Sequence, residues 1–274
     1  MKKGIIVAVS VLAAIVISLN VFHESIGSFT AKIIYRDTVS QYNISDSSQV
    51  INLKKGDYIY FGKYNGKNIL WKVVSVSDDG MPVLLSEKVI CFMPFNSGRE
   101  LKADSSNWET STIRQWLNST ENKSYVFECS SYNKIKNDSI TVNGGFLCAE
   151  NFCENELSAL SEGDDKVFLP SRKILSGLAA KERKKAPTAD AVINDGSRYI
   201  QFRSTCWYWT QTPISTNTSS VTAVTTSGSF YKSISNDALT GVCPALNLKS
   251  SSVNICGGKG TLEKPYVFAS EVSE

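Results

Sequence analysis

Side chains able to do acid–base or covalent chemistry are few in this sequence. Its 274 residues include seven cysteines but one histidine, His23, which ends a long apolar run. The rest of the chain can therefore hold neither a Ser–His–Asp triad, nor a Cys–His pair, nor a histidine-ligated metal. The carboxylates that we considered as paired acids lie in contexts typical of turns and solvated surface, and we expect no metal, cofactor or catalytic residue. They are Asp57, Glu87, Glu109 and Asp237.

The cysteines offer either disulfides or thiols. In an exported chain their number favours disulfides, and the odd count leaves at least one thiol over. Cys148 and Cys153 enclose four residues and are spaced for a small-loop disulfide. The alternative is that all seven are thiols, if the host exports few disulfides. The seven are Cys91, Cys129, Cys148, Cys153, Cys206, Cys243 and Cys256.

Three adjacent aromatic residues form the densest cluster of large side chains, at Trp207, Tyr208 and Trp209, with Pro213 closing the stretch. In a strand, Trp207 and Trp209 face one side of the sheet and Tyr208 the other. One interpretation is an aromatic core strand, which is the common fate of such rings. The other is that one ring lines a ligand cleft.

The N-terminus predicts a membrane segment. Lys2 and Lys3 precede residues 4–22, which carry no charge; a helix of that length rises about 28 Å, close to the hydrocarbon thickness of a bilayer. We favour an uncleaved anchor over a cleaved secretory signal, because the run is long and no good Ala-x-Ala site follows. The predicted organisation is an anchor at 1–27, a stalk or entry strand at 28–50, and one exported domain at 51–270. If the signal is cleaved, the domain is secreted.

Charge excludes one class of partner. The formal net charge of +3 is small, and no basic run is interleaved with aromatic residues, so we expect no nucleic-acid partner. The densest charge cluster, at 181–185, is typical of a solvated helix end.

Turn signals predict the elements that must position these residues. Asn65-Gly66 indicates a tight hairpin between a strand ending at Tyr64 and a return strand at 68–76, and a third strand at 81–90 completes a meander. Thr110 or Ser111 is a fitting N-cap for a short helix, on which Ile113, Trp116 and Leu117 share one apolar face at i, i+3 and i+4. We place Trp116 and, on the return strand, Trp71 in the core. A second helix is predicted at 172–183. Exposed strands are predicted at 219–226 and 228–234, and a closing strand broken by proline at 241–248.

Several short blocks follow one another along the chain: GDYIYFG from Gly56, LLSE from Leu84, IRQWLN from Ile113, VFLPS from Val167 and the segment from Gly241 to Leu248. Together they resemble an uncharacterised bacterial domain family of unknown function. That family is similar to the C-type-lectin-like fold of formylglycine-generating enzymes, which implies an α+β domain with a mixed sheet, short helices and much irregular loop. Gln211 and Cys243 stand where the family usually has arginine, so a guanidinium fork for an anionic ligand is missing at both.

The resemblance implies two candidate functions. Formylglycine-generating enzymes hold copper between two cysteines, which makes a copper/thiol oxidase at Cys148 and Cys153 the alternative. Glu150 and Glu154 are their neighbours, whereas reactive thiolates want nearby cations. Calcium-type sugar-binding motifs are missing. We therefore favour a non-enzymatic domain that binds a surface glycan, peptide or protein.

The same resemblance places binding on the loops and short strands of the C-terminal half. There we expect a site formed by Tyr208 or Trp209, with Gln211 and the Ser/Thr-rich segment that ends at Tyr231. It also brings together the blocks that contain Cys206 and Cys243, which we expect to be spatial neighbours, as thiols or as a disulfide.

The first prediction concerns topology. If residues 4–22 anchor the chain and everything after residue 29 is exported, protease added to intact spheroplasts digests the folded domain or its stalk. Full protection of the domain in spheroplasts, with cleavage only after lysis, would reverse the orientation.

Overall fold

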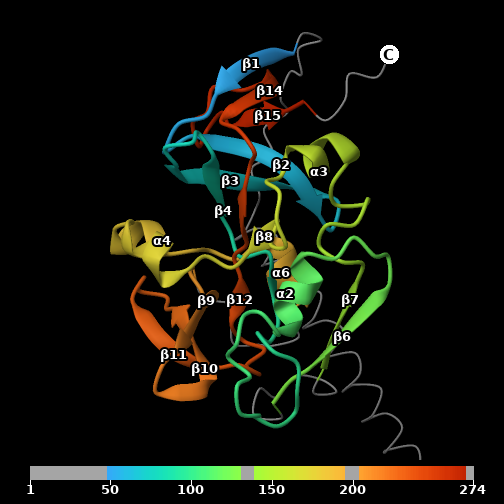
Figure 1. Cartoon of the computed structure of the whole chain (residues 1–274), viewed down its shortest axis with the longest axis vertical. Coiled ribbons are helices and arrows are strands. Elements are labelled where there is room, and N and C mark those ends of the chain that lie inside the picture. The colour runs from blue at the N-terminus through green and yellow to red at the C-terminus, as the bar shows by residue number, and fades with distance from the viewer. Residues whose placement is uncertain (1–47, 131–138, 195–203, 270–274) are drawn as a thin grey trace, which may run out of the picture.

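The computed structural model of the protein describes residues 48–130, 139–194 and 204–269 (Figure 1). Two large sheets and one small hairpin form a mixed α+β framework with few, short helices, as expected from the sequence. The strands are β1 Gln49–Asn52, β2 Tyr58–Tyr64, β3 Lys67–Val76, β4 Pro82–Ser86, β5 Cys91–Phe92, β6 Ser124–Glu128, β7 Ser139–Asn143, β8 Val167–Phe168, β9 Tyr208–Ile214, β10 Asn217–Val224, β11 Phe230–Ile234, β12 Gly241–Val242, β13 Ala245–Asn247, β14 Ser252–Gly257 and β15 Tyr266–Phe268. The helices are α2 Thr112–Leu117, α3 Glu154–Ala159, α4 Arg172–Ser176, α5 Ala180–Arg183 and α6 Ala189–Asn194.

The larger sheet has eight strands in the order β1-β14-β15-β2-β3-β4-β13-β8 and occupies the upper part of Figure 1. Its centre is the expected antiparallel meander β2-β3-β4. The predicted turn is confirmed, because Asn65 and Gly66 have φ of 51° and 73° and connect Tyr64 to its strand partner Lys67. Positive φ at both central positions is what a two-residue hairpin of this twist requires.

The third strand of the meander is shorter than predicted. We expected a strand at 81–90, but β4 ends at Ser86. The chain beyond Glu87 takes a different partner: the Val89 N–H donates to the Ala186 carbonyl at 3.0 Å, and the Thr188 N–H donates to the Val89 carbonyl at 2.9 Å. The start of β3 therefore extends beyond the end of β4.

The smaller sheet has five strands in the order β11-β10-β9-β12-β5. The strands predicted at 219–226 and 228–234 correspond to β10 and β11 and pair antiparallel. The expectation that both are exposed was wrong for β10, whose residues from Ser220 to Val224 are buried. The reason is position, since β10 lies between β9 and β11 and turns Val221 and Ala223 into the core.

A proline divides the closing strand between the two sheets. β12 belongs to the five-stranded sheet and β13 to the eight-stranded sheet, with Cys243 and Pro244 between them. Proline has no N–H for a ladder, so it suits a point where a strand changes sheets. Its carbonyl accepts a hydrogen bond from the Ser86 N–H at 2.9 Å, which keeps the crossing close to β4.

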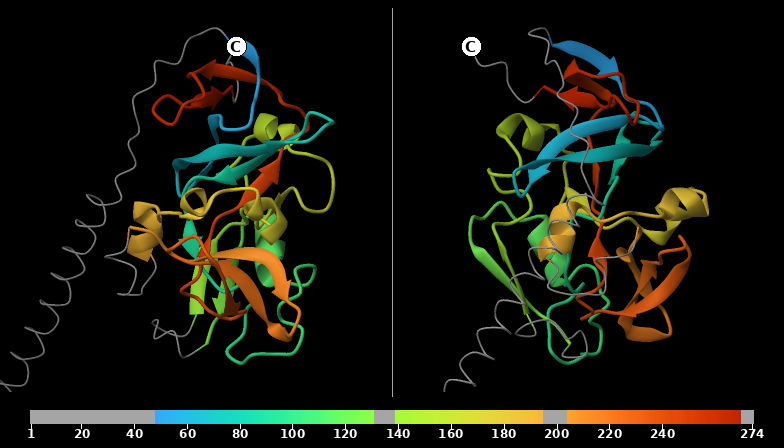
Figure 2. Two further views of the ribbon diagram at one scale, coloured as in Figure 1. Left: turned by 90° about the vertical axis from the view of Figure 1, so that its left-hand side faces the viewer. Right: turned by 180° about the vertical axis from the view of Figure 1, so that it is seen from behind.

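Helix α2 and the β6–β7 hairpin lie beside the sheets. The Ser111 hydroxyl caps α2 by accepting from the Arg114 N–H, as one of the two predicted caps. The predicted apolar face of Ile113, Trp116 and Leu117 is fully buried. Figure 1 and the right-hand view of Figure 2 place β6 and β7 on the opposite side of α2 from the five-stranded sheet.

The helix expected at 172–183 is broken into α4 and α5. Arg183 stabilises the turn between the two helices, because its guanidinium donates to the carbonyls of Leu178 at 2.6 Å and Gly228 at 2.7 Å. The solvated helix end predicted at 181–185 was wrong at its last residue. Lys185 is only 2% exposed, and its ammonium contacts Glu87 at 3.0 Å.

Indole rings organise the core. Trp71 and Trp116 are fully buried, as predicted, and their N–H groups donate to the carbonyls of Phe61 at 2.6 Å and Gly144 at 3.1 Å. Buried indoles need such partners, because an unpaired N–H away from water is costly.

The predicted anchor at 1–27 and most of the predicted stalk lie outside the described residues. No helix in the described part of the chain is long and apolar enough to cross a membrane. The stalk prediction meets the described structure only at β1, which enters the larger sheet beside β14.

The second prediction concerns the core. Replacing Trp71 or Trp116 by alanine removes a fully buried ring and costs about 3–5 kcal/mol of unfolding free energy. Trp207→Ala, at a half-buried indole, is the matched control and costs less. Chemical denaturation measures all three, and equal midpoints for Trp71→Ala and the parent protein would contradict the placement.

Candidate functional site

Two of the aromatic residues expected to meet a ligand are closed off from solvent. Tyr208 and Trp209 are both 0% exposed. The Tyr208 hydroxyl donates to the Arg183 carbonyl at 2.9 Å, and the Trp209 N–H donates to the Met93 carbonyl at 2.8 Å. Both rings belong to the core, because β9 lies inside its sheet and is covered on both faces. The prediction that one of them lines a cleft is therefore corrected.

Gln211 and Tyr231 are nearer the surface. Gln211 is half-buried, and Tyr231 is 58% exposed. The Tyr231 ring meets Trp207 edge to face, with centroids 5.9 Å apart. Trp207, which we had not proposed as a site residue, is the partly exposed indole of the stretch. It precedes the first residue of β9 and so escapes the cover that the strand receives.

All seven cysteines are thiols in the structure, and none forms a disulfide. Cys243 contacts the Ser86 hydroxyl at 3.2 Å. Burial is the main cause that raises the pKa of Tyr208 well above its usual value. The thiols of Cys243 and Cys206 raise this pKa further, which places both of them near the Tyr208 hydroxyl.

The residues around Cys148 and Cys153 do not fit a copper/thiol site. Desolvation is the main cause that raises the pKa of both thiols; the carboxylates of Glu150 at Cys148 and Glu156 at Cys153 also raise it, while the backbone N–H groups of the same two residues lower it. A raised pKa leaves little of the thiolate that copper binds. Glu156 has a structural role, since its carboxylate accepts from the N–H groups of Gly62 at 2.8 Å and Cys153 at 3.0 Å.

Each of the four carboxylates singled out from the sequence forms a hydrogen bond or an ion pair with another residue of the domain. Asp57 accepts from the Lys54 N–H, Glu87 pairs with Lys185, Glu109 pairs with Arg114, and Asp237 accepts from Ser233 and Thr240. No group of three or more metal-ligating side chains occurs among the described residues. Each of these carboxylates therefore has a structural partner in the fold.

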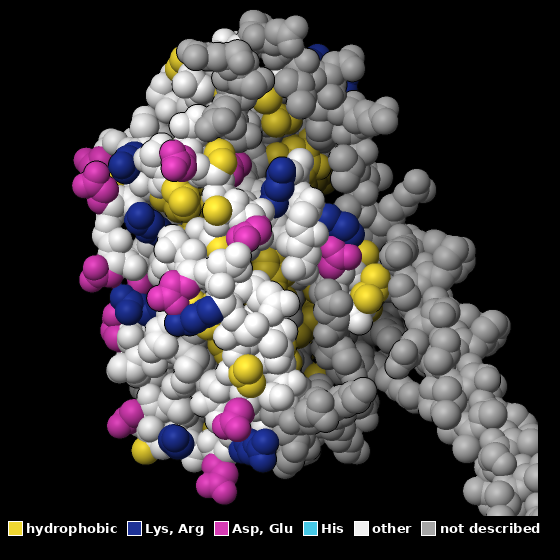
Figure 3. All heavy atoms as spheres, turned by 90° about the vertical axis from the view of Figure 1, so that its right-hand side faces the viewer, with side chains coloured by type: hydrophobic (Ala, Val, Ile, Leu, Met, Phe, Trp, Pro, Cys, Tyr) yellow, Lys and Arg dark blue, Asp and Glu magenta, His cyan; other side chains and the backbone are white. Residues whose placement is uncertain are grey.

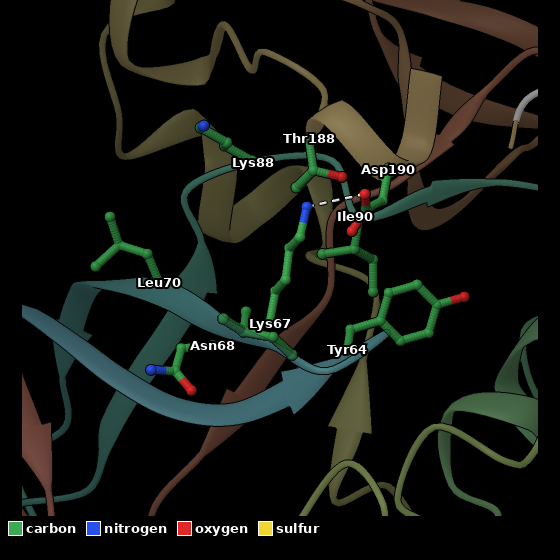
Figure 4. Close-up of a pocket in the computed structure, with 9 residues that line it drawn as sticks. Tyr64, Lys67, Asn68, Leu70, Lys88, Ile90, Thr188 and Asp190 are labelled. Carbon is green, nitrogen blue, oxygen red and sulfur yellow. Dashed lines mark hydrogen bonds and ion pairs between the residues drawn. The ribbon is translucent and has the colours of Figure 1, made fainter. Parts of the chain in front are cut away.

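A different place offers a cleft, which we call the β3–α6 cleft (Figure 4). It is small and open: the space that the centre of a water molecule can occupy is about 50 Å³, within about 450 Å³ of empty space that includes open solvent. One wall is the start of β3, and the other comes from the segment after β4 and from the start of α6. Its lining residues are Tyr64, Lys67, Asn68, Ile69, Leu70, Lys88, Ile90, Thr188 and Asp190.

The early end of β4 creates this cleft. The last bond between β3 and the following chain runs from the Glu87 N–H to the Leu70 carbonyl at 2.8 Å. Beyond it the chain leaves β3: Val89 pairs with the segment at Pro187, and the Ile90 N–H donates to the Val242 carbonyl at 2.9 Å. Sequence reasoning missed every residue of this cleft, because it assumed that the third strand continued to Ile90.

Opposite charges meet across the cleft. The Lys67 ammonium extends from β3 toward α6 and contacts the Asp190 carboxylate at 2.9 Å, as Figure 4 shows. The side chains are 46% and 23% exposed, so the pair is accessible to solvent. With Lys88 as a second lysine, the lining carries a net charge of +1.

The inner end of the cleft is closed by Tyr64. Desolvation raises the pKa of this phenol well above its usual value, and the neighbouring Cys91 thiol adds to the shift. Desolvation likewise raises the pKa of Cys91 to about 12, against a smaller opposing effect of its hydrogen bond with Tyr64. Both groups are therefore neutral at ordinary pH and present no charge to a ligand.

A scan against protein-family models matches residues 79–250 to a domain of unknown function, DUF6273. The match covers more than half of the chain. The chain belongs to the DUF6273 family. Searches of curated proteins and of solved structures each returned no match. The expected likeness to the C-type-lectin-like fold therefore remains a prediction.

The DUF6273 match contributes one wall of the cleft. Lys88, Ile90, Thr188 and Asp190 lie within it, whereas the β2–β3 hairpin precedes it. That hairpin is nevertheless part of the same eight-stranded sheet as β4 and β13, which lie inside the match. The structural unit is thus larger than the matched segment, and the cleft lies where the two parts meet.

Charges on the face shown in Figure 3 are mixed. Lysine and arginine side chains alternate there with aspartate and glutamate, and the described residues in that view form no broad patch of one sign. Nucleic-acid binding relies on a concentrated basic surface. This face does not offer one.

The third prediction concerns pH. The folded-state pKa of Cys91, about 12, lies above the ordinary thiol pKa of 9.0. An unfolded chain therefore loses this proton first, so the stability contributed by the neutral thiol is present below pH 9 and decreases as the pH rises toward 12. Unfolding free energies measured across this window fall less steeply in Cys91→Ala. Identical pH profiles for the variant and the parent protein would contradict the assignment.

Proposed function

We propose that this DUF6273 protein is a membrane-tethered, non-enzymatic domain that binds a peptide or glycan outside the cytoplasm, in the β3–α6 cleft. One observation carries the proposal: an open cleft with an aliphatic floor of Ile69 and Ile90 and a charged rim of Lys67, Lys88 and Asp190. An apolar lining with a few polar groups is typical of ligand sites.

Binding suits the chemistry of this cleft better than catalysis does. Lys67 and Asp190 neutralise each other, and the raised pKa of Tyr64 keeps its phenol protonated at ordinary pH, so no phenolate is present to act as a base. The Thr188 hydroxyl accepts a hydrogen bond from the Ala191 N–H at 3.1 Å, and none of the described residues that line the cleft pairs it with a base. A nucleophile needs an adjacent base within hydrogen-bond reach. The lining is thus arranged to hold a ligand, and the thiol environments give no support to the copper oxidase.

The location is proposed from the N-terminal sequence. Lys2 and Lys3 before an uncharged run of membrane-spanning length favour an anchor whose positive end stays inside. The domain then faces the cell wall or the medium, where glycans and peptides are available. The mixed charge of the face in Figure 3 supports a partner other than nucleic acid.

The fourth prediction tests this proposal with the full chain in detergent micelles on an array of cell-wall glycans and peptides. The double variant Lys67→Ala/Asp190→Ala removes both ends of the ion pair, so neither charge is left unpaired. We expect it to weaken binding about tenfold or more, the loss expected for one charge-assisted hydrogen bond.

The matched control is Lys249→Ala. Lys249 also pairs with a carboxylate, Glu162 at 3.4 Å, and its side chain is 47% exposed, close to the value for Lys67. It lies outside the cleft and its loss leaves binding unchanged. No signal on the array, or equal binding by the parent and both variants, would refute the proposed function.

A further inference from the structure

The hairpin that forms one wall of the cleft determines where the backbone of Asn68 points. Tyr64 and Lys67 flank the two-residue turn, so they are the hydrogen-bonded pair that closes it. The next pair, Lys63 and Asn68, is then a non-bonded pair. The N–H and C=O of Asn68 therefore point away from β2.

A second contact gives the same direction independently. Within one strand, alternate residues bond to the same neighbour. The Leu70 carbonyl accepts from Glu87 on the β4 side, whereas the Val73 N–H donates to the Asp57 carbonyl on the β2 side at 2.8 Å. Asn68 lies two residues before Leu70 and so faces the β4 side.

On that side β4 has already ended. The β3–β4 register begins at Trp71 opposite Ser86, and Glu87 is the last residue to bond to β3. No other described residue forms a ladder bond with Asn68 on this side. The cleft thus contains a short open strand edge that offers one backbone donor and one backbone acceptor.

We infer that the cleft binds an extended peptide segment, which adds to the open edge of β3 through a pair of backbone hydrogen bonds with Asn68. This inference rests on the proposed function and names the class of its ligand. Addition of a peptide strand to an exposed sheet edge is a general recognition mode, in which backbone bonds give affinity and side-chain pockets give specificity. Here the pockets beside the edge are the aliphatic floor and the charged rim.

The lining also favours a peptide over a glycan. Sugar rings bind best against exposed aromatic faces, and the one aromatic residue of the cleft, Tyr64, is largely desolvated by its neighbours. The aliphatic floor of Ile69 and Ile90, with Leu70 beside it, instead suits a leucine, isoleucine or valine side chain.

Charge specifies a second feature of the peptide. The Lys67 ammonium lies at the rim of the cleft, where it is 46% exposed and pairs with Asp190 at 2.9 Å. A ligand carboxylate beside Lys67 competes with Asp190 for this ammonium. Because exposed ion pairs contribute little to stability, opening the Lys67–Asp190 pair opposes binding only weakly.

The probe is a library of N-acetylated tetrapeptides, each with one aliphatic and one acidic residue, titrated calorimetrically against the full chain in micelles. For the tightest member, a series of backbone esters replaces each amide N–H in turn by oxygen. We expect one ester position to weaken binding about tenfold, because this ester removes the N–H that donates to the Asn68 carbonyl. The N–H groups of the adjacent residues point away from β3, so esters at those positions change the affinity little.

The acidic residue is tested by exchange for its amide. That change weakens binding to the parent protein and to Lys249→Ala about equally, but has much less effect on Lys67→Ala, which has already lost the partner charge.

Tetrapeptides that bind in the cleft but show no sensitive ester position would overturn the edge-addition inference and leave the proposed function standing. Glycans that bind in the cleft while no tetrapeptide does would have the same consequence. Peptide binding that Lys67→Ala and Lys67→Ala/Asp190→Ala leave unchanged would overturn both, because the site would then lie outside the cleft.

Discussion

One segment contributes a strand to each of the two large sheets. Residues from Gly241 to Asn247 form β12 in one sheet and β13 in the other, and Pro244 between them cannot donate to either ladder. The backbone at this point is nevertheless secured, because the Pro244 carbonyl accepts from Ser86 and the Cys243 thiol contacts the Ser86 hydroxyl. Both sheets are thereby held at the end of β4.

The cleft is a consequence of that arrangement. Where β4 ends, the chain leaves β3 and associates with the segment around Ala186 and Thr188. Lys185, just before that segment, is buried, and its ammonium pairs with Glu87. This ion pair, largely removed from water, holds the chain after β4 against the 186–188 segment and away from β3. Because both walls rest on sheet or on paired segments, the cleft keeps its shape without a ligand, as a precise binding site requires.

Local signals predicted local structure well. Asn65-Gly66 determined a hairpin because few other dipeptides accept positive φ at both positions, and Ser111 with the spacing of Ile113 and Trp116 determined the cap and face of α2. The α+β class and the family followed from such blocks. In each case the deciding interaction lies within a few residues along the chain.

Long-range pairing was where sequence reasoning failed. Nothing local shows that the strand after Met81 ends at Ser86, because its end is decided by the competing partner at Ala186, about a hundred residues later. The burial of Lys185 likewise depends on Glu87, and the burial of Tyr208 and Trp209 on the elements that cover β9. The cleft escaped prediction for the same reason, since it forms where a predicted pairing does not continue.

Hydrogen exchange of one amide tests the open edge of β3 most directly. In the free protein, the Asn68 N–H should exchange with solvent rapidly, whereas the Val73 N–H, which donates to Asp57 within the same strand, should be protected. Nuclear magnetic resonance resolves the two amides in one experiment. Protection of Asn68 equal to that of Val73 would show that the edge is already paired, and would contradict the binding cleft described here.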